Sequence, residues 1–387
     1  MNDPSFESLK KHFQLDPTVT YLNHGSFGAC PKPIFDNLIY WQKKLEQDPI
    51  KHLEFDIYNY SIASREALSH YVHCDKDDIV FSPNPSTALN TIIKSLDLRS
   101  NDEILTTNHE YGALDKTWNF ICKKTGAKYI KTDIKLPLLS ENDFTNSIIK
   151  NVTKNTKIIF LSHITSSTGL IFPIEKICDF ARENNILCII DGAHAPGHIP
   201  LNINKINPDV YVGACHKWMC APKGTSFLYA KKEIQDQIDP LVVSWGYESD
   251  TPSHSKFLDY HQWQGTNDYS AYLTMPAIID FLKKYNWITV SKKCRENNLI
   301  AREMLNSFLD KEPISDDKFI GQMSSIDLDC KDIMGLRTQL YKEFKIQVPI
   351  FEWNNKTFLR ISMQAYNDIS DIDKLIFALK KLVKFIK

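Results

Sequence analysis

The stretch Asp191-Gly-Ala-His-Ala-Pro-Gly-His198, followed closely by Gly213-Ala-Cys-His-Lys-Trp218, decides how this chain folds. Each half comes at the end of a short apolar run that is rich in β-branched residues. Such runs are typical of buried parallel strands. Ligands of open α/β sheets bind outside the carboxyl ends of the strands, so we expect Asp191 and Lys217 at one ligand-binding edge.

Similar apolar runs recur along the first two thirds of the chain, and helical periodicity separates them. The segment 173–185 is one such helix, with Ile174, Ile177 and Phe180 expected to face the sheet. Strands that alternate with helices predict an α/β fold with a doubly wound, mostly parallel sheet and right-handed crossovers. The predicted strands are 79–82, 103–107, 157–162, 186–190, 209–213 and 225–230.

Strict alternation ends at about Tyr269, after which long helices and separate strands predict a smaller α+β domain. A chain of 387 residues is also too long for a typical single core. We therefore predict an N-terminal arm over 1–20, a large domain over 21–265 and a small C-terminal domain over 266–387. The polar and aromatic stretch 244–261 shows little periodicity and is interpreted as an active-site loop.

Composition excludes several classes of function. The net charge of −1 gives no electrostatic reason for binding nucleic acid or an anionic membrane. No apolar run approaches the roughly 18 residues that span a bilayer. The first residues lack the basic and apolar regions of a secretory signal, so a cytoplasmic location is expected. The 9 cysteines are irregularly spaced, which fits reduced thiols, and the histidines form no metal-binding pattern.

An acid and a lysine at one sheet edge are what pyridoxal phosphate (PLP) chemistry requires. The lysine forms a Schiff base with the cofactor aldehyde, and the acid keeps the pyridine nitrogen protonated. The alternative is that Asp191 begins a turn and Lys217 is a solvated charge. Ser86 and Thr87 open a helix after the strand at 79–82, where backbone N–H groups and hydroxyls can hold a phosphate. A simple N-cap would explain one of these hydroxyls equally well.

The motifs also resemble those of the class V aminotransferase family of fold-type I PLP enzymes. Within the family, the chain is most similar to the branch named after isopenicillin N epimerase, which is related to the cysteine desulfurases. The motifs that carry the resemblance are Asn23-His-Gly-Ser-Phe-Gly28, Asn84-Pro-Ser-Thr87, His109-Glu-Tyr-Gly112, Ser162-His163 to Thr168-Gly169, Asp191-Gly-Ala-His194, Cys215-His-Lys-Trp218 and Arg360-Ile-Ser362. They run in the family's order over nearly the whole chain.

The resemblance implies a role for each further site residue. It implies that Tyr111 stacks on the cofactor ring, that Ser166 lies near its phenolic oxygen and that His194 lies beside Asp191. It implies that His216 donates to the phosphate and that Thr266 reaches the phosphate of a partner subunit, which would make the protein a homodimer with shared active sites.

The substrate side is implied in the same way, with His24 and Ser26 as contacts of an amino-acid substrate. Arg360 lies among apolar strand residues and needs an anion, which is either an internal carboxylate or the substrate's α-carboxylate. One departure from the desulfurase branch is Ala214, which stands where that branch has a phosphate-binding serine.

The reaction itself stays open between several outcomes that begin with loss of the Cα proton to Lys217. Epimerisation or racemisation is the first expectation, and β-elimination by a C–S lyase from a cysteine conjugate or its sulfoxide is the alternative. Transamination is a further outcome. Cysteine desulfurase chemistry is disfavoured, because the segment 347–355 contains no cysteine. A hypothesis of a different class is a non-catalytic PLP-binding scaffold.

Overall fold

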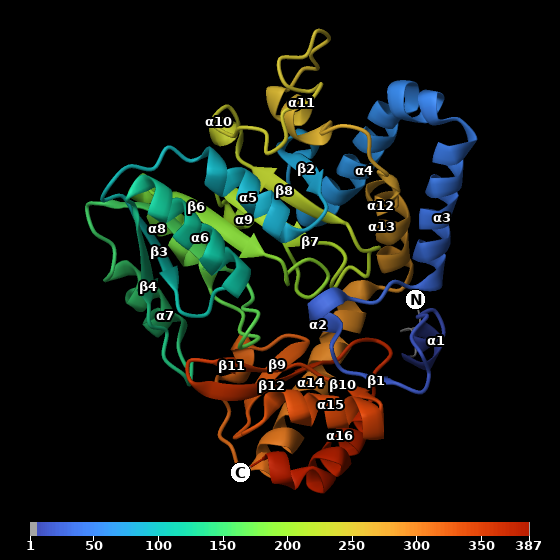
Figure 1. Ribbon diagram of the computed structural model, residues 1–387, viewed down its shortest axis with the longest axis vertical. Coiled ribbons are helices and arrows are strands. Elements are labelled where there is room, and N and C mark those ends of the chain that lie inside the picture. The colour runs from blue at the N-terminus through green and yellow to red at the C-terminus, as the bar shows by residue number, and fades with distance from the viewer. Residues whose placement is uncertain (1–5, 387) are drawn as a thin grey trace.

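A sheet of 7 strands, in the order β2-β8-β7-β6-β5-β3-β4, forms the centre of the molecule (Figure 1). The computed structural model describes residues 6–386. Only β8 runs antiparallel to its neighbours in this sheet, and all other pairs are parallel. The predicted doubly wound, mostly parallel sheet is confirmed. Its strands are β2 (Ile79–Ser82), β3 (Glu103–Thr107), β4 (Lys128–Thr132), β5 (Thr156–Ser162), β6 (Leu187–Gly192), β7 (Val210–Ala214) and β8 (Ser226–Ala230).

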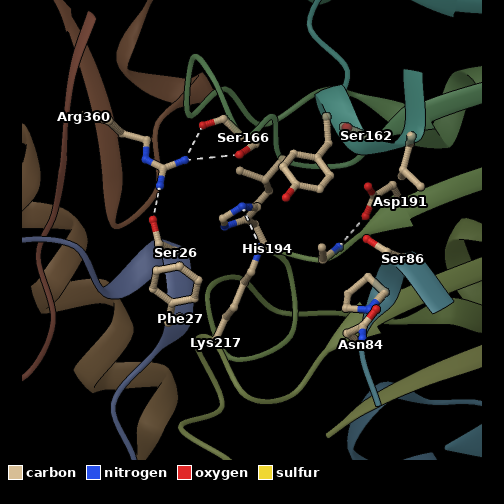
Figure 2. A pocket seen from close by; sticks show the side chains of 16 residues that line it. Ser26, Phe27, Asn84, Ser86, Ser162, Ser166, Asp191, His194, Lys217 and Arg360 are labelled. Atoms are coloured by element: carbon tan, nitrogen blue, oxygen red, sulfur yellow. Dashed lines mark hydrogen bonds between the residues drawn. The ribbon is translucent and has the colours of Figure 1, made fainter. Parts of the chain in front are cut away.

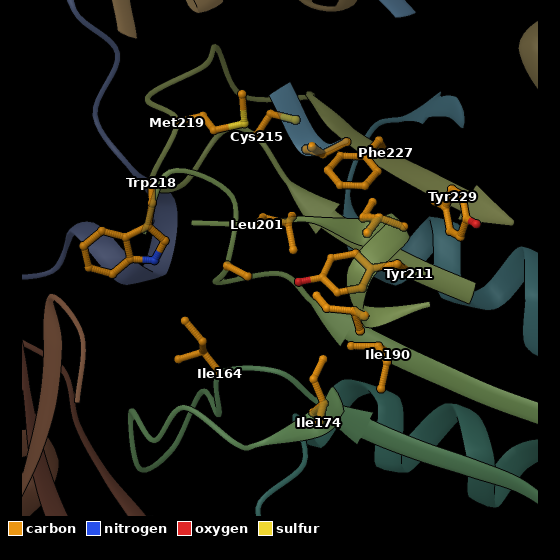
Figure 3. Close-up of a cluster of buried hydrophobic side chains, with 14 of the residues drawn as sticks. Ile164, Ile174, Ile190, Leu201, Tyr211, Cys215, Trp218, Met219, Phe227 and Tyr229 are labelled. Atoms are coloured by element: carbon orange, nitrogen blue, oxygen red, sulfur yellow. The ribbon is translucent and has the colours of Figure 1, made fainter. Parts of the chain in front are cut away.

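Both faces of this sheet are buried at its central strands, because successive side chains point to opposite faces and nearly all of them are apolar there. In β5, Ile158 and Phe160 join the core under one layer of helices, whereas Ile159 and Leu161 join the core on the opposite face. Figure 3 shows part of the second core, where Tyr211 and Phe227 pack together. One layer contains α5 (Pro85–Ser95) and α6 (Gly112–Thr125), and the other contains α4 (Ile57–Val72), α7 (Glu141–Ile149) and α8 (Ile174–Glu183).

The C-terminal lobe has a core of its own around an antiparallel sheet in the order β11-β12-β9. The start of the chain takes part in this lobe, because β1 (Thr20–Tyr21) pairs with β10 (Ile346–Gln347) and Leu22 is buried in its core. The other elements of the lobe are β9 (Met323–Asp327), β11 (Ile350–Trp353), β12 (Lys356–Ser362), α14 (Trp287–Leu309), α15 (Ile333–Phe344) and α16 (Ile369–Lys381).

The predicted boundary at 266 lies before two helices that pack on the large lobe. These helices, α12 (Ser270–Leu273) and α13 (Met275–Lys284), contact α3 (Lys32–Gln47) and α4. From α14 onward the chain packs on the small sheet instead. A division into two lobes stays a proposal, with its boundary better placed near Asn286.

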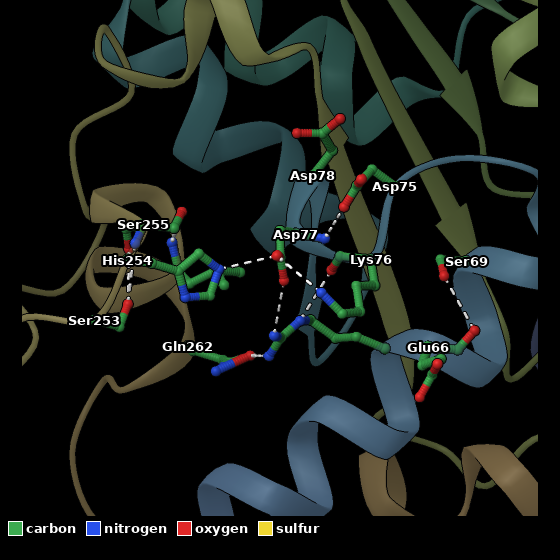
Figure 4. A network of polar contacts seen from close by, with 12 residues as sticks. Glu66, Ser69, Asp75, Lys76, Asp77, Asp78, Ser253, His254, Ser255 and Gln262 are labelled. Carbon is green, nitrogen blue, oxygen red and sulfur yellow. Dashed lines mark hydrogen bonds and ion pairs between the residues drawn. The ribbon is translucent and has the colours of Figure 1, made fainter.

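Residues 244–255 form the irregular loop that was expected, whereas the end of the segment is helical, and a role of this loop at an active site stays a prediction. The helix α11 (Lys256–Gln262) contacts β2, and the loop before it projects from the molecule (Figure 1). Asp77 anchors it, since this carboxylate lies 2.9 Å from His254 Nε2 and 3.3 Å from the guanidinium of Arg65, which also donates to Gln262 (Figure 4).

No helix within residues 6–386 combines the length and apolarity needed to cross a membrane.

The helices not yet described are short. The short elements are α1 (Phe6–Lys10), α2 (His24–Phe27), α9 (Ile203–Ile206), α10 (Lys232–Gln235), the π-helical turn η1 (Lys51–Asp56) and the 3-10 turns η2 (Lys76–Asp78), η3 (Asp317–Phe319) and η4 (Val383–Phe385).

One glycine sets how closely the N-terminal segment approaches the loop that carries Lys217. Gly28 ends α2 with φ of +66°, and a Cβ there would lie 1.9 Å from the carbonyl oxygen of His216. We expect Gly28→Ala to lower the free energy of unfolding by about 2 kcal/mol or more, since it adds both backbone strain and a clash with backbone. Urea unfolding measures this change.

Gly112→Ala is the matched control, because a Cβ at Gly112 would meet no heavy atom within 4 Å. Gly112 begins α6, so alanine there should change stability by less than about 1 kcal/mol. Equal stabilities of the two variants would contradict the close packing at Gly28.

Candidate active site

A cavity of about 240 Å³ lies at the carboxyl ends of β5, β6 and β7, where they meet the start of α5. The short helix α2 and Arg360 on β12 lie on the opposite side of it (Figure 2). Segments from both lobes therefore build this one cavity. Of the predicted site residues, it is lined by Ser26, Ser86, Tyr111, Ser166, Asp191, His194, Lys217 and Arg360.

Lys217 reaches the cavity from the loop that follows β7. Its Nζ lies 3.0 Å from His194 Nε2. Burial lowers the pKa of Lys217 to about 8; the negative charge of Asp191 opposes this shift and the positive charge of Arg360 adds to it. A much larger share of Lys217 is therefore the free amine at neutral pH than for an ordinary lysine, which suits a nucleophile or a base.

Asp191 stands near the end of β6 and is 4% exposed. Its Oδ1 accepts the N–H of Ala193 at 2.9 Å. Burial raises the pKa of this carboxyl, while the Ala193 N–H and the charge of Lys217 act in the opposite direction. A buried carboxylate that faces a cavity is best stabilised by a cationic ligand group, and the protonated nitrogen of a pyridine ring is such a group.

The start of α5 presents only one of the two predicted hydroxyls to the cavity. Asn84 is the N-cap of this helix, and its Oδ1 accepts the N–H of Thr87 at 2.9 Å. Ser86 and Asn84 line the cavity, whereas Thr87 lines a neighbouring pocket together with Thr266. The phosphate role of Ser86 fits this geometry, and that of Thr87 does not. Thr266 is exposed, and its predicted contact with a partner subunit stays a prediction.

His216 does not line the cavity. A contact with Thr225 determines which of its ring nitrogens carries the proton. Nδ1 of His216 lies 3.0 Å from the Thr225 carbonyl oxygen, so Nδ1 must carry the proton that this carbonyl accepts. Nε2 of the neutral ring is then an acceptor. Burial lowers the pKa of His216 to about 4, so the ring becomes a phosphate donor only if the phosphate itself favours its protonation.

Arg360 is a buried cation without a carboxylate partner. One Nη donates to the carbonyl and the hydroxyl of Ser166, and the other donates to Ser26 Oγ at 2.9 Å (Figure 2). Nε has no hydrogen-bond partner, and no carboxylate of residues 6–386 forms an ion pair with this guanidinium. Burial lowers the pKa of Arg360 to about 10. The internal ion pair considered for Arg360 is therefore not formed, and an anionic ligand fits the site.

Of the two remaining predicted residues, Tyr111 lines the cavity and His24 does not. The Tyr111 ring lines the mouth of the cavity and is 47% exposed, as a ring free to stack on a ligand would be. His24 is fully buried outside the lining, with Nε2 2.9 Å from the Lys217 carbonyl oxygen and Nδ1 2.8 Å from the Tyr366 hydroxyl. His24 supports the backbone of Lys217, and a direct substrate contact has no support in this geometry.

Sequence reasoning assigned no role to two polar residues at this site. Ser162, the last residue of β5, lines the cavity, and its N–H and hydroxyl both donate to Glu110, at 2.8 and 2.6 Å. Glu110 is buried, and burial raises its pKa to about 8. The position of Ser162 at the end of a buried strand could have identified it, whereas nothing local to Glu110 indicates that it is buried.

The chain is similar to known proteins over nearly its whole length. The family model described as aminotransferase class V matches residues 47–375. Isopenicillin N epimerase of Amycolatopsis lactamdurans is 30% identical over 396 residues, which cover 98% of this chain and 99% of the relative. Hercynylcysteine sulfoxide lyase of Schizosaccharomyces pombe is 24% identical, with 94% of each chain covered.

The fold is shared with a solved structure of a C-DES variant that has glycine covalently linked to its PLP cofactor. The TM-score is 0.82 at 19% sequence identity, with 97% of this chain and 99% of the other chain covered. This likeness confirms the predicted fold-type I architecture. Since the family model spans most of the sequence and a relative matches nearly its full length, the chain belongs to the class V aminotransferase family of PLP-dependent enzymes.

Proposed function

We propose that this chain uses PLP bound through Lys217 to act at Cα or Cβ of an amino-acid substrate, with epimerisation or racemisation as its reaction. One observation carries the proposal. Lys217, Asp191 and Arg360 all face one cavity, and Arg360 has no carboxylate partner among the described residues. The identity of 30% to an isopenicillin N epimerase supports the choice of reaction.

The residues of the cavity fit the cofactor at each of its polar groups. Ser86 and the start of α5 would hold the phosphate, Asp191 would pair with the ring nitrogen, and Tyr111 would stack on the ring. Bound in this way, PLP supplies an electron sink for negative charge at the substrate's Cα. The other side of the cavity is left for the substrate.

Arg360 would bind the α-carboxylate of the substrate. Its two Nη groups are held by Ser26 and Ser166, which fixes the plane of the guanidinium. A guanidinium held in this way can donate two parallel hydrogen bonds to a carboxylate. With the carboxylate fixed and the amino group directed to the cofactor, Lys217 would take the Cα proton, since it lines the same cavity with its pKa lowered to about 8.

The second candidate is a C–S lyase that expels a sulfur group from Cβ of a cysteine conjugate or its sulfoxide. The likeness to hercynylcysteine sulfoxide lyase supports it, and a base on one face of the substrate suffices for elimination. Desulfurase chemistry stays disfavoured, because none of the described residues that line the cavity is a cysteine and Cys330 lies elsewhere, in the small lobe. Transamination and a non-catalytic scaffold are further outcomes of the test below.

We also propose that the protein is a homodimer whose partner chain completes each site. Large apolar side chains are exposed near α4 and in the segment before α11. Such a surface on a protein of this size is typical of a subunit interface. The exposed set includes Ile50, Phe55, Tyr58, Val243 and Trp245.

Lys217→Ala should abolish the violet-blue absorbance of the bound cofactor and all turnover, because it removes the amine that holds PLP. Purified wild-type protein is incubated with L-amino acids and cysteine conjugates, and four products are measured: D-isomer, pyruvate, keto acid and sulfide.

Each product identifies one reaction. D-isomer identifies an epimerase, pyruvate identifies a lyase, keto acid from other amino acids identifies a transaminase, and sulfide with alanine identifies a desulfurase. Lys231→Ala is the control, since Lys231 pairs with Asp209 at the opposite edge of the sheet. Wild-type protein that takes up PLP but forms no product would support the scaffold hypothesis, and protein that stays colourless with added PLP would refute the enzyme.

Arg360→Gln should lower kcat/KM for the amino-acid substrate by about 10- to 100-fold, because it removes charge-assisted hydrogen bonds to the carboxylate. It should leave the binding of the corresponding amine, which lacks the carboxylate, nearly unchanged, as measured by the change in cofactor absorbance. Arg302→Gln is the control, since Arg302 is also buried but already pairs with Asp317. Equal losses with both substrates would count against the carboxylate role.

Mixing Lys217→Ala with Thr266→Ala subunits should restore activity above that of either variant alone. In a mixed dimer, one site would combine an intact Lys217 with an intact Thr266 from the other chain. Activity after mixing and light scattering of the same sample together measure this. A monomeric protein, or mixtures no more active than the Thr266→Ala parent, would refute the shared site.

A further inference from the structure

His194 lies between the indole of Trp218 and the amine of Lys217, and each of its ring nitrogens has one of them as a partner. Trp218 Nε1 lies 3.3 Å from His194 Nδ1, and Lys217 Nζ lies 3.0 Å from His194 Nε2. Trp218 is fully buried and His194 is 3% exposed. Adjacent residues of the chain thus contact opposite sides of one imidazole ring.

The indole nitrogen can only donate a hydrogen bond, so Nδ1 of His194 must be the acceptor. A neutral imidazole that accepts at Nδ1 carries its proton on Nε2, and that proton faces Lys217. Lys217 can accept this proton's hydrogen bond only as a free amine, because an ammonium group has no lone pair. The alternative places an ammonium proton on Nε2 and a ring proton on Nδ1, where it would oppose the Trp218 N–H.

We propose that Trp218 is a positioning residue that fixes the Nε2–H tautomer of His194 and thereby favours the free-amine form of Lys217 over the ammonium form. This goes beyond the proposed reaction and rests on it only in giving Lys217 the role of the reactive amine. The tautomer itself is a property of the protein chain without cofactor or substrate.

The surroundings keep both rings in this arrangement. Nδ1 of His198 lies 3.0 Å from the His194 carbonyl oxygen, and the N–H of Gln322 donates to Nε2 of His198. His198 therefore carries its own proton on Nδ1 and donates it to the backbone of His194. The His198 ring also packs on the Trp218 ring at a centroid distance of 4.1 Å. A rotation of Trp218 would disrupt these contacts.

The charged groups around the pair act in the same direction, with one exception. Burial lowers the pKa of His194 well below its ordinary value. The charge of Lys217, whenever it is protonated, the positive charge of Arg360 and the nearby rings of His198 and His216 add to this. Asp191 alone disfavours the free amine, because its negative charge favours the protonated form of Lys217. The hydrogen bond from Nε2–H to the free amine thus opposes the effect of Asp191, whose charge raises the pKa of Lys217.

The direct test reads the tautomer in the full-length protein after removal of the cofactor. Two-bond ¹⁵N–¹H correlation spectra of ¹⁵N-histidine-labelled protein distinguish the two neutral tautomers from the protonated ring, and the signals missing in His194→Gln assign residue 194. We expect the Nε2–H pattern at neutral pH. An Nδ1–H or doubly protonated His194 in the wild type would overturn the proposal without recourse to any Trp218 variant.

The second test replaces the indole donor while keeping an aromatic ring. In Trp218→Phe, His194 can adopt the Nδ1–H tautomer and accept from an ammonium, so the pKa of Lys217 should rise. We expect the rate of acetylation of Lys217 at neutral pH, measured by peptide mass spectrometry, to fall about threefold to tenfold, as the loss of one hydrogen bond implies.

Trp118→Phe is the matched control, because Trp118 is equally buried and its Nε1 has no hydrogen-bond partner among the described residues. Its acetylation rate and its His194 spectrum should equal those of the wild type. A folded Trp218→Phe protein with an unchanged tautomer and rate would refute the role of Trp218. Neither measurement depends on turnover, so a failure of the proposed reaction would leave this result readable.

Discussion

Asp191, Lys217 and Arg360 place two positive charges and one negative charge around a single small cavity, and much of the architecture serves to hold them there. Parallel strands bring Asp191 and Lys217 to the same edge of the sheet, and the second lobe brings Arg360 from the opposite side. Burial raises the pKa of Asp191 and lowers the pKa of both cations. Each charge is therefore costly on its own and becomes favourable once a ligand with complementary charges occupies the cavity.

Much of this arrangement could be predicted from the sequence because its determinants are local. The strands that carry Asp191 and Lys217 are short runs of β-branched residues, and their alternation with helices fixes a parallel sheet. The rule that ligands bind at the carboxyl ends of such strands then identifies the site. Arg360 could be recognised as a buried cation in the same way, from its apolar neighbours in β12.

The remaining features depend on contacts between segments that lie far apart in the chain. His24 is a polar residue in a glycine-rich stretch, and nothing nearby predicts that it is buried with hydrogen bonds to Tyr366 and the Lys217 carbonyl. Thr87 lines a pocket together with Thr266, which lies far along the chain. The helix α11 forms where polar and aromatic residues gave little periodicity, held by the distant Asp77. The proton position on His194 follows only once Trp218 is seen beside it.

The pairing of β1 with β10 has a consequence for how the protein is made. Thr20 and Tyr21 leave the ribosome long before their partners Ile346 and Gln347. The central sheet contains all of its own strands by Ala230 and can form earlier during synthesis. The small lobe cannot close until Ile346 and the segments after it have been made, because these late residues complete the core that buries Leu22. A nascent chain thus holds Asp191 and Lys217 in place before it acquires Arg360, so the cavity gains all of its charged groups only after Arg360 has been made.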